Sequence, residues 1–127
     1  MVHKQVSTKS LEQIDVALRE SAARHSFGVV AVHDLRQTMR NKGVDFGPAC
    51  FVYEVCNPHQ AKKVLEADGS ISSALPCRIS VYETPQGATE LATILPTAML
   101  GIYGKPELAE TATEVEAVVL QMMKDAS

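Results

Sequence analysis

The chain has 127 residues, a mass of 13.7 kDa, and 12 basic against 15 acidic side chains. This length is typical of one domain, and 46% hydrophobic residues are enough for a core, which excludes disordered and low-complexity classes. The formal net charge of −3 gives no electrostatic reason to expect nucleic acid or an anionic membrane as a partner. We therefore expect one globular domain over residues 1–127.

The cysteine content and the hydropathy pattern predict a cytoplasmic protein. The N-terminal residues lack the apolar run of a secretion signal, and no stretch approaches about 18 consecutive apolar residues. Three cysteines are an odd number and too sparse for a disulfide scaffold. We therefore expect all three cysteines to be reduced thiols in the cytoplasm.

The first elements are a strand and a helix. Residues 2–7 predict a short strand, and Ser10 with Gln13 forms a capping box that starts a helix running to about His25. One apolar stripe along this helix needs a sheet or another helix to cover it. The stripe consists of Leu11, Ile14, Leu18 and Ala22.

A second strand and a short helix follow. Residues 27–32 form a mostly apolar, β-branched run, and Asp34 directly after it can cap a helix that ends before Gly43. Residues 49–55 alternate between two faces and predict the third strand.

The second half of the chain predicts two more helices and a hairpin. Asn57 and Pro58 are an N-cap and a first helical residue, and this helix should end near Asp68 and Gly69. Residues 77–84 and 88–95 predict a hairpin with a short turn. A long helix from Pro106 to the chain end has one buried face, formed by Leu108, Ala112, Val115, Val119 and Met122.

This order of elements predicts an α+β fold. It fits one mixed or antiparallel sheet of about five strands, with helices packed mainly on one face. The other face carries Arg78, Ser80 and Tyr82 and is only half polar. A half-apolar face is typical of dimerisation or of a ligand cleft, so we expect a homodimer.

The segment from Cys56 to His59 is the most informative for function, because it joins a strand end to a helix start. A thiol at a helix N-terminus meets unpaired amides and the positive end of the macrodipole, so we expect Cys56 to be acidic. A protonated His59 would lower its pKa further. Cys77 begins a later strand. The candidate ligand-binding or reactive residues are Cys56, Asn57, His59, Cys77 and Arg78.

Three interpretations of this segment stay open. Cys56 and Cys77 are packing residues, or they carry sulfur or form a reversible disulfide, or together with His59 they bind zinc, copper or haem iron. The metal interpretation lacks a fourth ligand within the segment. A disulfide requires both cysteines at the same end of the sheet, and the path of the chain between them decides that.

Several motifs resemble, in order and spacing, the domain-of-unknown-function 302 family (DUF302). The resemblance covers nearly the whole chain, and its most specific part is the Cys-Asn-Pro segment followed by Leu-Pro-Cys at a strand start. The matching segments are Phe27-Gly28-Val29, Val44-Asp45-Phe46, Cys56-Asn57-Pro58 with Ala61 and Leu65, and Leu75-Pro76-Cys77.

The resemblance implies a small α+β domain with a β-α-β arrangement similar to that of the TATA-box-binding protein, and it implies homodimers. It assigns no activity, no cofactor and no catalytic residue. Two positions depart from the family pattern. Ser26 stands where the family usually has Gly, and Leu95 before Pro96 stands where it usually has Asp. If that Asp belongs to a site, the site is altered in this chain.

The leading hypothesis is a small homodimeric accessory domain that handles a thiol, a sulfur species or a soft metal at Cys56 and Cys77. Whether it is an enzyme stays open. The alternative is a non-catalytic structural or protein-interaction module whose cysteines only pack. It would use the half-polar sheet face and the acidic start of the last helix, where Glu107, Glu110, Glu114 and Glu116 lie.

Overall fold

Alternating apolar and polar residues form one antiparallel sheet in the computed structural model, which describes residues 1–127. Its strands are β1 (Val2–Ser7), β2 (Gly28–Asp34), β3 (Cys50–Cys56), β4 (Cys77–Glu83) and β5 (Thr89–Ile94). Their order across the sheet is β1-β5-β4-β3-β2, and every neighbouring pair is antiparallel. The predicted five-stranded α+β fold is confirmed in its antiparallel form.

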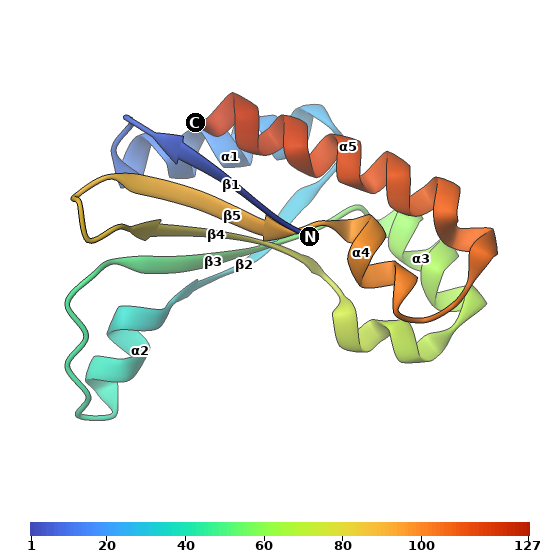
Figure 1. Ribbon diagram of the computed structural model, residues 1–127, viewed down its shortest axis with the longest axis horizontal. Coiled ribbons are helices and arrows are strands. Elements are labelled where there is room, and N and C mark those ends of the chain that lie inside the picture. Colours follow the sequence, from blue (N-terminus) through green and yellow to red (C-terminus); the bar gives the residue numbers. More distant parts are fainter.

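Two long helices cover one face of this sheet. Figure 1 shows α1 (Leu11–Arg24) and α5 (Ala109–Ala126) side by side above the strands. The short α2 (Leu35–Asn41) extends past one end of β2 and β3, while α3 (Pro58–Ala67) and α4 (Pro96–Gly101) gather at the other end. No helix crosses the middle of the opposite face, which we call the open face. None of the helices is both long and apolar enough for a transmembrane span.

The predicted apolar stripes meet in a single main core. On α1, Ile14, Leu18 and Ala22 are buried, and Leu11 packs against them at the margin. The sheet supplies the facing side chains through alternate residues of three strands, namely Tyr53, Val55, Ile79, Val81 and Leu91. The buried face of α5 is the predicted one, continued by Met123 and Ala126. Burial of these side chains fixes both helices on the sheet.

The pairing of β3 with β4 brings the two cysteines of interest to the same end of the sheet. Val55 lies directly opposite Cys77, and Cys56 follows Val55. The chain returns from the end of α3 through a 3₁₀ helix, η1 (Gly69–Ala74), before it enters β4. This return path places Cys56 and Cys77 at the same end of the sheet, which the sequence alone does not decide.

Three short elements differ from the sequence prediction. The helix α4 and the 3₁₀ helix η1 were not predicted, because six residues are too few to display helical periodicity. Pro106 starts a separate 3₁₀ turn, η2 (Pro106–Leu108), so the long helix begins at Ala109 instead of Pro106. The capped starts of α1, α2 and α3 are confirmed.

The C-terminal end of α1 forms a Schellman motif around Ser26. The Phe27 amide donates to the Ala22 carbonyl at 2.9 Å, and Ser26 takes a φ of 61° in the left-handed region. Ser26 is the one non-glycine residue with a positive φ. Because a Cβ is disfavoured in this conformation, the geometry explains why glycine is the usual residue at this position.

Ser26→Gly is expected to raise the free energy of unfolding by about 0.5–1 kcal/mol, because glycine adopts the left-handed conformation without a Cβ clash. Urea unfolding measures the change. Gly43→Ser is the matched reverse control, since Gly43 has a φ of 78° and open space around its Cβ position. The free energy of unfolding of Gly43→Ser should fall by a similar amount. If Ser26→Gly does not raise the free energy of unfolding, the loop relaxes the strain at Ser26.

Candidate functional site

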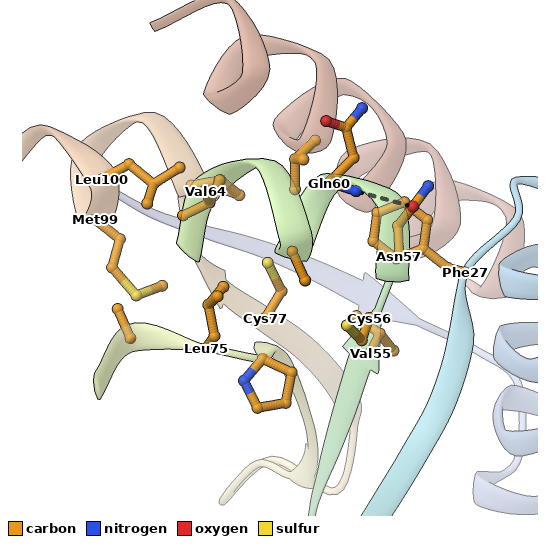
Figure 2. Close-up of a pocket in the computed structure, with 15 residues that line it drawn as sticks. Phe27, Val55, Cys56, Asn57, Gln60, Val64, Leu75, Cys77, Met99 and Leu100 are labelled. Atoms are coloured by element: carbon orange, nitrogen blue, oxygen red, sulfur yellow. Dashed lines mark hydrogen bonds between the residues drawn. The ribbon is translucent and has the colours of Figure 1, made fainter. Parts of the chain in front are cut away.

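An apolar cavity lies where β3 passes into α3 and η1 passes into β4 (Figure 2). Its volume is about 40 Å³, and 11 of the 15 residues that line it are hydrophobic. No Asp, Glu, His, Lys or Arg is among them. The lining residues are Phe27, Val55, Cys56, Asn57, Gln60, Ala61, Val64, Ala74, Leu75, Pro76, Cys77, Pro96, Met99, Leu100 and Val115. The cavity therefore presents mainly carbon and sulfur to any occupant, and its only polar side chains are the amides of Asn57 and Gln60.

The wall between β3 and α3 is fixed by Asn57. Its Oδ1 accepts hydrogen bonds from the backbone amides of His59, at 3.0 Å, and Gln60, at 3.2 Å. Pro58 at the first helical position has no amide to satisfy. The cap turns the chain at Cys56 and directs α3 over the cavity.

A small second core supports the opposite wall. Val64 of α3, Ile71 of η1 and Leu108 of η2 are buried together, and Leu100 of α4 packs against them. The hydroxyls of Ser73 and Tyr103 lie 2.7 Å apart and join η1 to the segment after α4. Three elements distant in sequence are thus held around one cavity.

The helix α4 is attached to α5 through Glu116. Leu95 occupies the N-cap position of α4 but offers no side-chain hydrogen bond. Instead, the Glu116 carboxylate accepts bonds from the Thr97 amide, at 3.2 Å, and from the Thr97 hydroxyl, at 2.6 Å. An Asp at position 95 would be a local cap, and Leu95 does not line the cavity. The departure at Leu95 therefore affects a helix end and leaves the cavity lining unchanged.

Both cavity thiols favour the protonated form. Burial, with a smaller contribution from the neighbouring Cys56, raises the pKa of Cys77 to about 11. Burial also raises the pKa of Cys56 above its ordinary value. The prediction of an acidic Cys56 is wrong, because Asn57 holds the N-cap position and accepts the free amides that would stabilise a thiolate.

The structure brings together only part of the predicted site. Cys56, Asn57 and Cys77 line the cavity, whereas His59 is exposed and does not line it. Arg78 lies on the open face, where its guanidinium donates to Glu54 at 3.3 Å. It borders a second cavity of about 130 Å³ that shares Ala74, Leu75, Pro76 and Met99 with the first.

The predicted metal set of Cys56, His59 and Cys77 does not gather within one chain. No group of three or more His, Cys, Asp or Glu side chains lies close enough to hold a metal ion. His59 is drawn away because it stands in the first turn of α3, with its backbone amide on the Asn57 cap. All three cysteines are free thiols.

Sequence reasoning missed the contribution of α4 to the cavity. Met99 and Leu100 of this helix form one side of it, and Phe27 closes another. Pro96 was the available signal, because proline is common at the first position of a helix. Its neighbour Leu95 is a poor N-cap residue, which hid the signal.

Comparisons with known proteins agree with this fold. The family described as "Domain of unknown function DUF302" matches residues 2–126. An "Uncharacterized protein" of Aquifex aeolicus (strain VF5) is 24% identical over 117 residues, which are 90% of this chain and 75% of that protein. The crystal structure of an "uncharacterized conserved protein DUF302 from Bacillus stearothermophilus" is similar with a TM-score of 0.92 and 26% identity, covering 99% of this chain and 98% of that one.

Cys77 is expected to react slowly with iodoacetamide near pH 7. A pKa of about 11 in place of 9.0 leaves about 100-fold less thiolate, and only the thiolate is nucleophilic. The rate should keep rising with pH beyond 9, measured by mass spectrometry of peptides from the wild-type protein, which separates Cys77 from the other two cysteines. A fast modification of Cys77 at pH 7 would contradict the raised pKa.

Proposed function

The chain belongs to the DUF302 family, which is defined by sequence and fold, and we propose its function from the cavity. The protein is a small domain that binds a compact apolar or soft ligand. The observation that carries this proposal is that Cys56 and Cys77, from two paired strands, line the same apolar cavity. Two free thiols facing one space of this kind are suited to a ligand that prefers sulfur to water.

The size of the cavity favours a ligand of a few atoms. A single water needs about 10–15 Å³ of such space, and pockets for drug-sized molecules measure roughly 300–1,000 Å³. The cavity of about 40 Å³ is far below that range. A haem does not fit without large rearrangement, so a sulfur species or a single metal ion is the better candidate.

The protonation state of the thiols favours binding over thiol transfer. Burial keeps Cys56 and Cys77 neutral near pH 7, and a neutral thiol is a poor nucleophile. Free thiols also persist best in a reducing compartment, which supports a cytoplasmic location. The role we favour is that of an accessory domain that holds its ligand.

We also propose that the domain is a homodimer formed through the open face. Val2 and Val6 of β1 and Ile94 of β5 are exposed there by 56%, 63% and 52%. The same face carries both charge signs: Lys4 and Arg78 are basic, and Glu54, which accepts from Arg78, is acidic. A surface that mixes apolar groups with both charges can be complementary to its own copy.

The competing function is a protein-interaction module with packing cysteines. The open face and the glutamates at the start of α5 would then contact a different protein, and the cavity would stay empty. The two functions differ in one measurable respect, namely whether purified protein carries a ligand that depends on the cavity.

Native mass spectrometry of freshly purified protein is expected to show a dimer with an added mass that leaves on acid denaturation. Ala61→Leu fills the cavity and should remove the adduct. Ala67→Leu is the matched control, because Ala67 is an exposed residue on the same helix and does not line the cavity. Circular dichroism checks that both variants fold.

Two results would overturn ligand binding. A bare chain mass for the wild type would favour the interaction module. An adduct that persists in Ala61→Leu would place the ligand outside the cavity.

The dimer is tested by charges on the open face. Val6→Lys combined with Ile94→Lys should raise the dimer dissociation constant by about tenfold or more for each charge, because each lysine would be buried unpaired. Analytical ultracentrifugation measures the constant. Val16→Lys on the outer surface of α1, where Val16 is 54% exposed, should leave it unchanged. A monomeric wild type, or a dimer insensitive to both lysines, would contradict this interface.

A further inference from the structure

The cavity contains a third sulfur atom that the sequence motifs did not indicate. Met99 of α4 lines the same space as Cys56 and Cys77. Figure 2 shows the Cys77 side chain in the middle of the cavity, with Met99 on the α4 side and Cys56 on the β3 side. Three sulfur-containing residues from three separate elements therefore line one small apolar volume.

We propose that the sulfur atoms of Cys56, Cys77 and Met99 bind one copper(I) ion in this cavity. The inference rests on the proposed function, because it names the ligand of the same cavity. It replaces the exposed His59 of the sequence-based set with a residue that the fold places at the site.

The donor set selects a soft cation. Thiolate and thioether sulfur favour copper(I), whereas magnesium, calcium and manganese require carboxylate, carbonyl or water oxygen. No carboxylate lines the cavity. Zinc is also soft enough for thiolates, but its structural sites use four Cys or His ligands, and a thioether is not among them. No imidazole or carboxylate is present to complete such a set.

The cavity also has the dimensions and flexibility that one ion requires. Its volume of about 40 Å³ admits a single ion and leaves little room for additional ligands. Strand pairing fixes the backbone at Cys77, opposite Val55. Met99 has an unbranched side chain with three rotatable bonds, so its thioether can adjust to the ion.

Copper(I) neutralises one of the two thiolate charges. Binding releases one proton from each thiol to solvent, so two thiolates and one copper(I) leave a net charge of −1. Because these protons compete with the ion, the apparent copper(I) affinity should rise with pH.

The test is an anaerobic titration of the reduced protein with copper(I), in competition with a chromogenic copper(I) chelator. We expect one copper(I) per chain. Cys56→Ser and Cys77→Ser should each abolish competition with the chelator. Met99→Leu, which keeps the side-chain volume, should lower the affinity by at least about tenfold. Cys50→Ser and His59→Ala are the matched controls and should retain wild-type affinity.

X-ray absorption spectroscopy supplies a readout that a purely structural role would not change. The wild-type ion should have three sulfur neighbours, and the ion in Met99→Leu should have two. An equal number of sulfur neighbours in both proteins would remove Met99 from the site. A copper(I) affinity that falls in Cys50→Ser or His59→Ala would overturn the proposal. A higher affinity for zinc than for copper(I) would also overturn it.

The failure of this site and the failure of the proposed function give different results. An organic or sulfur adduct that requires the cavity, together with no copper(I) binding, would overturn only the copper site. Copper(I) affinity that is unchanged in Ala61→Leu would overturn both, because the ion would then lie elsewhere.

Discussion

The antiparallel pairing of β3 with β4 is the constraint on which the rest of the site depends. It places Val55 opposite Cys77, so the chain that leaves β3 at Cys56 must return to the same end of the sheet. The return path is α3 followed by η1, and their buried residues form a second small core with α4 and η2. The cavity is the space left between this second core and the sheet. Its position follows from the register, because a slip of one residue would turn Cys77 to the open face.

The cavity walls depend on interactions that differ in range. Asn57 caps α3 through adjacent amides, which is a local effect encoded in three consecutive residues. The helix α4 lacks a side-chain cap of its own and is held by Glu116 from α5. A local cap and a long-range cap thus stabilise opposite sides of the same cavity. Because Glu116 lies far along the chain, the stability of α4 depends on the packing of α5 against the sheet.

The sequence predicted most of the framework and part of the site. Strong local signals fixed the ends of α1 and α3, where Ser10 and Asn57 are good N-caps, and the apolar stripe of α1 identified its buried residues. The same signals failed for α4, because a six-residue helix shows no periodicity and its cap comes from another helix. Electrostatic reasoning failed at Cys56 for a related reason: the amides expected to stabilise its thiolate are bound by Asn57, so burial decides its pKa.

The sequence by itself determined the fold class, the family resemblance and the two cysteines at strand ends, since these depend on local patterns and short motifs. Only the tertiary structure decided that Cys56 and Cys77 line the same cavity, that Met99 joins them, and that His59 and Arg78 do not. The physical reason is that a cavity is defined by residues brought together through strand register and helix packing. Neither of these leaves a signal at the individual positions that line it.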